Sequence, residues 1–497
     1  MRAIVDSATM QLIEERAFAS GETAAGLMDL VGSQLAALLE RLIARFPCPP
    51  TILLLAGKGN NGADGYTALS LLFSKNLPTL ALQIAPPSTG SLAHARQKTY
   101  QDLGGKILFF PDLPQVEGPL IIIDGIYGIG FKGKPDEASS KAILWANAHC
   151  GIRVSIDIPS GVNATTGEIP DEAIRAEYTL SCQFPKKGCF IGSGWDYAGK
   201  IVIADLPLSL PKSDLVLLEE ADVSPLLPRY RRTQNKYEVG SVVGIAGSPG
   251  MMGAVSLACE ASYMVGSGYV RLLLPQGAEI GDLPREVVKT FLSDDIGEYS
   301  KWCKQADATF VGPGLGRDRL DRLDQLWPYL PPSTVVDADA LYWLAQKEQK
   351  EWNVQGKILT PHRGEAGRLV QKKIDHIDDS LLQLFRTLAL TSKSTILLKG
   401  APTFIFSEKS PIIAMPRGDP GMASAGTGDV LTGMIAGFLA QRLPSLSAAM
   451  LAAWLHGMAG ERAATLRTSY SLTASSLIES LPFAIKKLTK NISTNCH

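Results

Sequence analysis

Short apolar runs alternate with amphipathic stretches along the chain, in two successive blocks. In the first block, residues 51–56, 119–123 and 153–158 are mostly apolar and are predicted to form buried strands. In the second block, strands are predicted at residues 241–246, 270–274, 308–311, 334–336, 395–398 and 404–406. Apolar strands that alternate with helical patterns are typical of domains in which helices cover a parallel sheet. The pattern therefore predicts an α/β protein.

The two blocks are separated by residues 205–238, which contain a Leu-Pro-Leu-Ser-Leu-Pro run, an acidic spot and a basic spot. Prolines at this density indicate a linker with a short arm. A chain of 497 residues is also longer than one hydrophobic core usually supports. We expect two domains that meet near residue 215, namely residues 1–214 and 215–497.

Composition and charge narrow the possible partners. The net charge of −1 argues against a general electrostatic grip on nucleic acid or on an anionic membrane. The seven cysteines form no Cys-x-x-Cys pair, and no apolar run approaches the ~20 residues of a membrane span. Residues 1–18 lack the apolar centre of a signal peptide. We expect a cytoplasmic protein with reduced thiols and with neither nucleic-acid nor membrane partners.

Residues 418–429, Gly-Asp-Pro-Gly-Met-Ala-Ser-Ala-Gly-Thr-Gly-Asp, precede an apolar run at 430–440 that is predicted to be helical. Gly426 and Gly428 let a ligand approach the backbone, and the free N–H groups at a helix start attract anions. Asp429 would stand at this helix start, placed to take a proton from a hydroxyl group that is being phosphorylated. The alternative is a glycine-rich helix cap with a structural aspartate. The length of the pattern favours phosphoryl chemistry.

Each of the three predicted strands of the first block ends in polar residues. In chain order these are Asn60, Asn61 and Asp64, then Asp124, then Asp157 and Ser160. The carboxyl ends of parallel strands share one edge of a sheet, where ligands of open α/β sheets bind. Oxygen ligands without histidine or cysteine suit a hard cation better than zinc or iron. The alternative is that Asp124 and Asp157 only cap the helices that follow; the recurrence in three strands favours a site.

The motif Gly-Lys-Gly-Asn-Asn-Gly at residues 57–62 fits the dinucleotide-binding pattern G-x-G-x-x-G after a strand. A redox domain of that kind also needs an acidic residue about 20 positions later, for the ribose hydroxyl. No aspartate or glutamate occurs between Asp64 and Asp102. This absence argues against a redox NAD domain. A second loop, residues 125–134, is glycine-rich and basic and is suited to phosphates.

Residues 54–65, 124–134 and 157–161 resemble the three signature segments of the NAD(P)H-hydrate epimerases, over about residues 1–210 in all. The opening stretch agrees, with Glu14 in the first predicted helix and Leu27-Met28 before Gly32. The resemblance implies a Rossmann-like domain that interconverts the R and S hydrates of NADH or NADPH at ring carbon 6. It implies substrate contacts at Asn60, Asn61, Gly62, Ala63, Asp64, Gly128, Ile129, Gly130, Phe131, Lys132, Gly133, Lys134 and Asp157.

The same resemblance implies a potassium ion held by Asn61, Asp124 and Ser160. It makes Asp124 and Lys132 the candidates for proton transfer. One departure from the family is Ala63, because the family usually has glycine at this position. If the backbone there needs a positive φ, the alanine methyl group strains the loop and impairs the epimerase.

Five segments of the second block each follow a strand pattern: residues 247–254, 312–316, 337–341 and 399–403 follow strands given above, and 360–365 follows another short strand. Parallel strands bring such loops to one edge, so together they describe a single crevice. The segment 399–403 is predicted to join two strands of a hairpin. His362 lies in one of these loops and is a candidate ligand contact. His456, inside the apolar stretch 448–459, is expected to pack in the core.

These segments resemble the ADP- or ATP-dependent NAD(P)H-hydrate dehydratases, relatives of the ribokinase fold, over about residues 235–480. The resemblance implies contacts to the hydrated cofactor from Ala254, Gly316, His362 and Asp429. It implies an adenine nucleotide, with Mg²⁺, held by Lys399, Gly400, Ala401, Pro402, Thr403 and Gly428. The family has asparagine where this chain has Asp419. An added carboxylate there would either recruit Mg²⁺ or repel the nucleotide.

Together the resemblances predict a bifunctional repair enzyme, an isomerase joined to a lyase. A Rossmann-like parallel-sheet domain would be followed by a ribokinase-like α/β domain, and the substrates would be NADHX or NADPHX with ADP or ATP. A homo-oligomer is expected, with the apolar stretch 448–459 as a candidate interface. Two alternatives remain at this point. One is a small-molecule kinase of the ribokinase class, and the other is an N-terminal half that only binds nucleotide or oligomerises.

Overall fold

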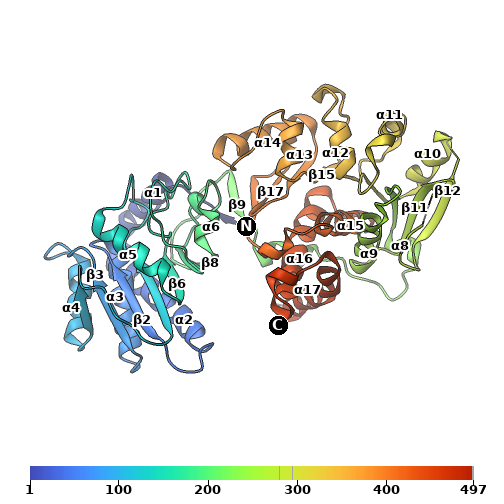
Figure 1. Cartoon of the computed structure of the whole chain (residues 1–497). Helices are drawn as coiled ribbons and strands as arrows, with labels where there is room; N and C mark the ends of the chain where they lie inside the picture. Colours follow the sequence, from blue (N-terminus) through green and yellow to red (C-terminus); the bar gives the residue numbers. More distant parts are fainter. Residues whose placement is uncertain (279, 294, 495–497) are drawn as a thin grey trace. The chain divides into compact units, whose positions relative to one another are not determined.

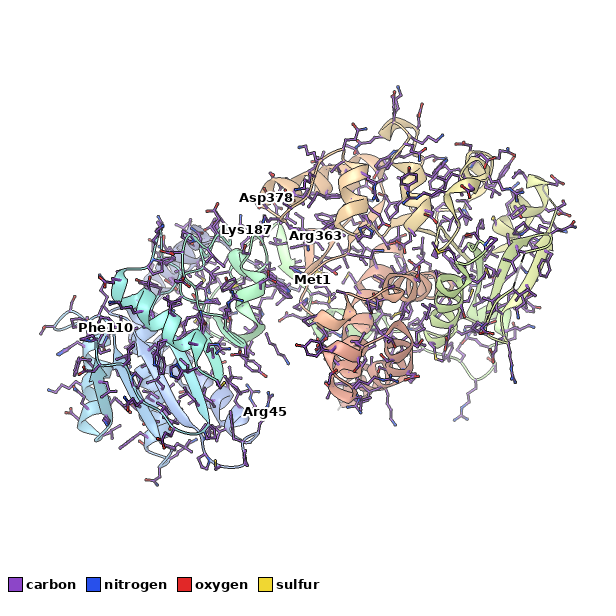
Figure 2. All side chains as sticks on the ribbon, in the orientation of Figure 1. Met1, Arg45, Phe110, Lys187, Arg363 and Asp378 are labelled. Atoms are coloured by element: carbon purple, nitrogen blue, oxygen red, sulfur yellow. The ribbon has the colours of Figure 1, made fainter. Side chains whose placement is uncertain are left out.

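The structure is a computed structural model that describes residues 1–278, 280–293 and 295–494. The described residues separate into two compact units: residues 2–215 with 376–379, and residues 216–375 with those from 380 onward. The first runs from blue to green in Figure 1, and the second from green to red. With all side chains drawn, the space between sheet and helices is filled in both units (Figure 2).

Within residues 2–215, seven parallel strands form one sheet in the order β4-β3-β2-β5-β6-β7-β8. The order reverses between β2 and β5, as in doubly wound, Rossmann-like sheets. The strands of the sheet are β2 (Thr51–Ala56), β3 (Thr79–Gln83), β4 (Lys106–Phe109), β5 (Leu120–Gly125), β6 (Ile152–Ile156), β7 (Tyr178–Cys182) and β8 (Lys200–Ala204). The unit also contains β1 (Arg2–Ala3) and the helices α1 (Ser7–Ala19), α2 (Ala24–Ile43), α3 (Asn60–Phe73), α4 (Leu92–Asp102), α5 (Glu137–Ala148) and α6 (Trp195–Ala198).

Both faces of this sheet are buried. Along β2, Ile52 and Leu54 belong to the apolar cluster that contains residues of α1, α2 and α3. Leu53 and Leu55 belong to the cluster that contains residues of α5, on the other face. A strand covered on both faces has no polar alternation, which explains why residues 51–56 form one apolar run. The predicted α/β class and the Rossmann-like N-terminal sheet are confirmed.

The second unit is built on a larger sheet, in which the order is β9-β18-β17-β16-β15-β14-β13-β10-β11-β12. The strands are β9 (Leu215–Leu217), β10 (Ser241–Ile245), β11 (Tyr269–Pro275), β12 (Val288–Leu292), β13 (Ala308–Val311), β14 (Thr334–Val336), β15 (Ile358–Leu359), β16 (Thr395–Leu398), β17 (Thr403–Phe406) and β18 (Ile412–Met415). The strands from β12 to β16 run parallel, with a reversal of order between β10 and β13. Strands β16, β17 and β18 are antiparallel, so the predicted hairpin around residues 399–403 is confirmed.

Helices cover this second sheet. They are α7 (Glu220–Val223), α8 (Lys236–Val239), α9 (Met252–Met264), α10 (Ile296–Gln305), α11 (Asp321–Leu326), α12 (Ala338–Leu344), α13 (Arg363–Leu369), α14 (Asp379–Ser392), α15 (Thr427–Ala440), α16 (Ser445–Leu466) and α17 (Ala474–Thr494). Helix α15 packs on β10, β13 and β14 and against α9, and α16 packs against α15 and α17. Residues 448–459 of α16 are buried in this core, so they cannot supply the subunit interface suggested by their apolar sequence. Among the described helices, all are too short or too polar to cross a membrane.

Candidate active sites

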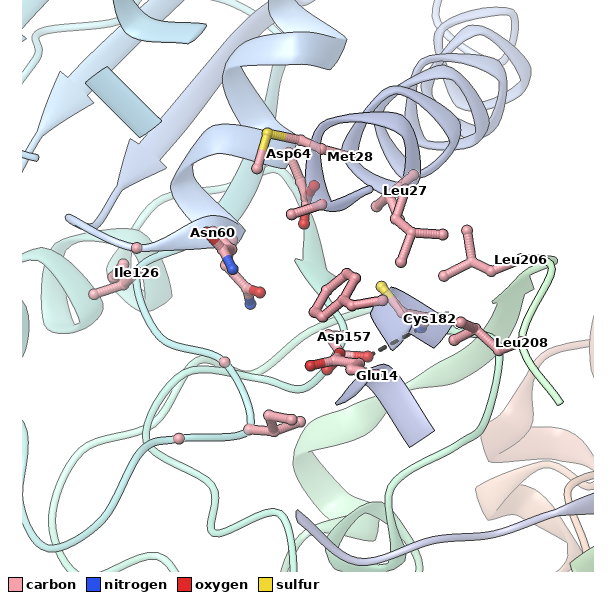
Figure 3. A pocket seen from close by; sticks show the side chains of 18 residues that line it. Glu14, Leu27, Met28, Asn60, Asp64, Ile126, Asp157, Cys182, Leu206 and Leu208 are labelled. Atoms are coloured by element: carbon pink, nitrogen blue, oxygen red, sulfur yellow. Dashed lines mark hydrogen bonds between the residues drawn. The ribbon is translucent and has the colours of Figure 1, made fainter. Parts of the chain in front are cut away.

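A cavity of about 340 Å³ opens at the carboxyl edge of the N-terminal sheet. It lies where the strand order reverses, next to the loops that follow β2 and β5. Its polar lining comes from Glu14 of α1, from Asn60, Asn61 and Asp64 in the first turns of α3, and from Asp157 after β6. Apolar side chains complete the wall, among them Leu27, Met28, Leu206 and Leu208 (Figure 3). This is where a doubly wound sheet binds its ligand.

The residues predicted from the loop after β5 divide into two groups. Gly128, Ile129 and Gly130 line the cavity. The remainder of the segment, Phe131, Lys132, Gly133 and Lys134, does not line it, and the three residues 132–134 are exposed. Gly128 fits closely against the cavity floor, because a Cβ added there would lie 2.8 Å from Asn61 Oδ1. A direct role of Lys132 in proton transfer stays a prediction that the lining of this cavity does not favour.

Gly62 and Ala63 lie in α3, buried behind the cavity wall. Ala63 has helical backbone and is absent from the residues with positive φ. Its methyl group packs against Met28 and Ala93 in a small apolar cluster. The strain considered for this departure from the family therefore does not arise.

Asp124 lies beneath the cavity, fully buried at the end of β5. Its carboxylate accepts hydrogen bonds from Ser155 Oγ at 2.7 Å, from Ser160 N at 2.8 Å and from Ser160 Oγ at 2.5 Å. Burial raises its pKa, and these hydrogen bonds oppose the rise. The idea that Asp124 caps a following helix is wrong, because the next helix, α5, begins at Glu137 and is capped by Asp136.

Oxygen atoms gather around Asp124 from three loops. Asn61 Nδ2 donates to Tyr127 O and Ile156 O, each at 2.8 Å, which brings these carbonyl groups beside the amide. Ser160 Oγ lies between Asp124 and the backbone of Tyr127. The largest influences on the pKa of Asp124 are burial and its hydrogen bonds from Ser160, Ser155 and Ile126. A fully buried carboxylate in an oxygen-only environment fits a potassium ion held by Asn61, Asp124 and Ser160.

Asp157 adopts the left-handed backbone conformation, with φ 67°, which is uncommon outside glycine but tolerated by aspartate. Its Oδ1 accepts hydrogen bonds from Cys182 N at 3.0 Å, the dashed line in Figure 3, and from the Lys186 ammonium. The Lys186 side chain has no exposed surface. Burial acts against its charge, but Asp157 outweighs burial and the pKa of Lys186 is raised. This lysine was not predicted as a site residue, because it stands in a Pro-Lys-Lys-Gly stretch typical of a surface loop.

The second site lies at the carboxyl edge of the C-terminal sheet, where β14, β15 and β16 end side by side and α15 begins. Helix α15 starts at Thr427 behind Gly426, whose φ is 91°. Gly428 is pressed against a lysine, because a Cβ there would lie 3.2 Å from Lys399 Nζ. The predicted nucleotide residues Lys399 and Gly428 are thus neighbours at this helix start.

Three carboxylates surround the Lys399 ammonium. Asp337 Oδ1 lies at 2.8 Å and Glu365 Oε2 at 4.0 Å, and Asp429 adds to their electrostatic effect. Burial acts against the charge of Lys399, yet the carboxylates together raise its pKa. Burial, with the nearby charge of Asp337, raises the pKa of Asp429 to about 7, although Lys399 opposes the rise. Asp429 therefore titrates near neutral pH, at the start of α15.

The other predicted contacts of this crevice are arranged around the same centre. His362 caps α13, and its Nδ1 accepts hydrogen bonds from Gly364 N at 3.0 Å and Glu365 N at 3.3 Å. Its backbone pairs with that of Lys399. Gly316 N donates to Asp339 Oδ2 at 2.9 Å, and Asp339 in turn contributes to the raised pKa of Asp429.

Thr403 Oγ1 donates to Gly400 O at 3.0 Å across the turn that also contains Ala401 and Pro402. Ala254 lies in the first turn of α9. His456 is buried and its Nε2 lies 2.9 Å from Thr427 O, so it supports the start of α15 from within the core. Burial lowers its pKa to about 4, as expected for a packing residue.

Asp419 does not add a free carboxylate to the crevice. Its Oδ1 accepts a hydrogen bond from Gly421 N at 2.8 Å, and its Oδ2 accepts one from Ser469 Oγ at 3.1 Å. Both oxygens are engaged within the loop that precedes α15. Among the described residues, no group of three or more His, Cys, Asp or Glu side chains is arranged to hold a metal ion.

Comparison with known proteins identifies relatives of both units. The family model described as NAD(P)H-hydrate dehydratase matches residues 242–483, and the model described as YjeF-related protein N-terminus matches residues 24–188. A bifunctional NAD(P)H-hydrate repair enzyme of Moorella thermoacetica is 32% identical over 495 residues, which cover 94% of this chain and 93% of the relative. One of Coxiella burnetii is 31% identical over 492 residues and covers 97% of this chain and 99% of the relative.

Solved structures resemble the C-terminal part. A ribokinase-like superfamily protein of Enterococcus faecalis aligns with a TM-score of 0.49 at 24% identity, covering 56% of this chain and 98% of that protein. The ADP/ATP-dependent NAD(P)H-hydrate dehydratase of Bacillus subtilis, co-crystallised with ATP and Mg²⁺, aligns with a TM-score of 0.48 at 26% identity. That alignment covers 54% of this chain and 97% of the other.

Proposed function

The chain belongs to the family of bifunctional NAD(P)H-hydrate repair enzymes, and from this premise we propose how its two units share the repair. The enzyme converts hydrated NADH and NADPH back to the intact cofactors. Residues 1–214 form the epimerase, which exchanges the R and S hydrates at ring carbon 6. Residues 215–497 form the dehydratase, which uses ADP or ATP to return the S hydrate to NAD(P)H. The kinase of unrelated purpose is not retained, because relatives with this repair activity match nearly the whole chain.

Dehydration needs a better leaving group than hydroxide. Transfer of a phosphoryl group from the nucleotide to the hydroxyl on carbon 6 supplies one. The lone pair of the ring nitrogen then expels phosphate, and loss of a proton from carbon 5 restores the dihydronicotinamide ring. The protein must take the hydroxyl proton during transfer and stabilise the charge on the transferring group.

The observation that carries this assignment is the position of Asp429. It stands in the first turn of α15, beside the Lys399 ammonium, with a pKa raised to about 7 by burial and by the charge of Asp337. A base of that strength takes up the hydroxyl proton near neutral pH. The backbone N–H groups at the start of the helix and the Lys399 ammonium stabilise negative charge on the phosphoryl oxygens.

The remaining contacts follow from the same centre. Lys399 to Thr403 and Gly428 hold the adenine nucleotide. Ala254, Gly316 and His362 join Asp429 in binding the hydrated cofactor. Mg²⁺ bound to the nucleotide would neutralise its phosphate charge, and the engaged carboxylate of Asp419 is not counted among its ligands.

The epimerase works in the cavity beside α3. The predicted contacts that line this cavity would bind the hydrate, namely Asn60, Asn61, Asp64, Gly128, Ile129, Gly130 and Asp157. Potassium, held by Asn61, Asp124 and Ser160, would fix the loops after β2, β5 and β6 against one another. We place the enzyme in the cytoplasm, on the grounds of its cysteine pattern.

Racemic hydrate with ADP or with ATP tests both halves in one reaction. Recovery of absorbance at about 340 nm from all of the hydrate shows that both units are active, because only one epimer is a substrate of the dehydratase. Recovery from half of it shows a dehydratase without an epimerase. Nucleotide consumption without recovery of absorbance contradicts the proposal and favours a kinase.

A further inference from the structure

The acid and base of the epimerase are to be sought among the side chains that line its cavity. Asp124 lies beneath it with four hydrogen bonds, and Lys132 is outside its wall. The lining contains four side chains able to exchange protons, namely Glu14, Asp64, Asp157 and Cys182. Burial raises the pKa of the Cys182 thiol well above its ordinary range, so this thiol stays neutral.

Asp157 is held in place and keeps one oxygen available. Both of its bonds, from Cys182 N and from the Lys186 ammonium, end on Oδ1. Among the described residues, Oδ2 accepts no hydrogen bond of normal geometry, and the Cys182 thiol is the further side chain close enough to interact with this carboxylate. The Lys186 ammonium that holds Oδ1 has no exposed side-chain surface. Asp157 thus presents a fixed carboxylate oxygen at the cavity wall.

Asp64 has the opposite environment. It is 7% exposed, and no donor among the described residues reaches its carboxyl group. Its place on α3 puts it on a different part of the wall from Asp157, as Figure 3 shows. Burial raises its pKa well above the ordinary value, with further contributions from the charges of Asp157 and Glu14, and Arg96 of α4 opposes the rise only in part. Asp64 is therefore a carboxylic acid with a proton to give.

We propose that Asp64 is the general acid and Asp157 the general base of the epimerase unit. The assignment rests on the proposed function and extends it to named catalytic groups. Two carboxyl groups with opposed environments in one cavity are the arrangement that acid–base enzymes use. An unpartnered carboxyl group that is more than nine-tenths buried and faces the cavity also calls for a ligand that completes its hydrogen bonds.

The step balances without an added reagent other than water. Asp64 gives its proton to the hydroxyl oxygen on carbon 6, the C–O bond breaks with its electron pair leaving on water, and the ring nitrogen lone pair forms a C=N bond. A water molecule then adds to the other face of carbon 6, the C=N pair returns to nitrogen, and Asp157 takes the proton of the entering water. The enzyme is left ready for the reverse inversion, with the proton now on Asp157.

Glu14 is the third carboxyl group of this cavity, and its pKa is also raised. Burial and the charge of Asp157 raise its pKa, and Lys186 lowers it. The charge of Asp157 raises the pKa of Glu14, and the charge of Glu14 in turn raises the pKa of Asp64. Glu14 lines the same cavity as Asp64 and Asp157.

The test compares Asp64→Asn with Asp102→Asn, a matched change at the exposed end of α4. In the whole protein, Asp64→Asn is expected to slow exchange of the R and S hydrates by about 10²–10⁴-fold. Its dehydratase rate on the S hydrate should equal that of wild type, which reports on folding and concentration in the same sample. The melting temperature should not fall, since the change removes an unpartnered buried acid. Asp102→Asn should leave both activities unchanged.

Asp64→Glu separates acidity from shape. It keeps a carboxyl group, so epimerisation should stay at least about tenfold faster than in Asp64→Asn. Equal losses in the two variants, or exchange within about twofold of wild type in Asp64→Asn, overturn the acid assignment while the proposed function stands. Absence of exchange in the wild-type protein would instead refute the epimerase itself.

Discussion

The Lys399 ammonium lies 2.8 Å from Asp337 Oδ1, and the two side chains are 19% and 2% exposed. The second oxygen of Asp337 accepts a hydrogen bond from Thr432 at 2.7 Å, one turn of α15 beyond Asp429. One buried carboxylate at the end of β14 therefore ties the loop after β16 to the start of α15. The charge of Asp337 also helps to raise the pKa of Asp429, the proposed base.

The dehydratase should lose activity on the acid side of neutrality. Asp429 accepts a proton only when ionised, and its pKa is raised to about 7 by burial and Asp337. The rate should therefore fall as the pH drops through about 7. In Asp337→Asn the neighbouring negative charge is lost, so the pKa of Asp429 falls and the midpoint moves to lower pH. A profile of kcat/KM between about pH 5 and pH 9 measures both effects.

Glu365→Gln is the control for that profile. Burial raises the pKa of Glu365 to about 7 as well, so this group titrates in the same range. Glutamine can still accept the hydrogen bond from His362 N, which Glu365 Oε2 accepts at 2.9 Å. The midpoint of the acid limb in the kcat/KM profile of Glu365→Gln should equal that of wild type. Loss of the acid limb in this variant, with no movement in Asp337→Asn, would assign the limb to Glu365.

Asp429→Asn should nearly abolish dehydration, by about 10²–10⁴-fold, because the amide cannot take the hydroxyl proton. Binding of the hydrate should persist, since the side chain keeps its size and place. Epimerisation in the other unit should be unaffected, and serves as the measure of intact protein. Recovery of absorbance in a nucleotide-dependent assay gives the rate; turnover close to that of wild type would mean that another residue is the base.

Asn61→Ala should make epimerisation independent of potassium. The amide holds the carbonyl groups of Tyr127 and Ile156 at 2.8 Å and stands beside Asp124 in the proposed ion site. The measurement compares exchange of the two hydrates in potassium and in choline salts, for wild type and variant. Dehydration of the S hydrate by the same samples is the control. A variant that keeps the potassium response of wild type would place the ion elsewhere.

Lys186→Met should destabilise the N-terminal unit. The change leaves Asp157 without its buried cation, and breaking a buried pair from one side costs about 3–5 kcal/mol in the free energy of unfolding. Lys134→Met is the matched control, since this exposed lysine lies 3.9 Å from Asp171 and should change stability by less than about 1 kcal/mol. Denaturant unfolding measures both. Equal stability of the two variants would mean that the buried pair contributes little.

The strands predicted from sequence include β2, β5 and β6 of the first sheet and β10, β13 and β14 of the second, whereas the interior strands β3, β7, β15 and β18 were not assigned ranges. Both faces of β2 and β13 are covered, so each is a continuous apolar run with 0% exposure at most positions. Strands β4 and β12 lie at sheet edges and were not predicted. Their residues are largely intermediate or exposed in burial, and Lys106 and Lys289 stand within them. An edge strand has fewer apolar positions, and its pattern merges with that of the loops.

The candidate sites were predicted as far as they depend on strand ends. The parallel order of β2, β5 and β6 brings Asn61, Asp124 and Ser160 together, as expected from their positions after those strands. Lys186 could not be predicted in the same way, because it comes from the loop after β7 and meets Asp157 across 29 residues. A lysine in a polar loop has no pattern that distinguishes a buried ion pair from a solvated surface.

The backbone at Ala63 does not require glycine, although the loop after β2 is glycine-rich. The residue is helical, and its methyl group fills space between Met28 and Ala93. An alanine at a helical site also restricts the unfolded chain, which raises the free energy of unfolding by about 0.4–1 kcal/mol relative to glycine. A search pattern that insists on two consecutive glycines would pass over this chain and others like it. Such patterns should admit small residues here, or active repair enzymes will be missing from genome surveys.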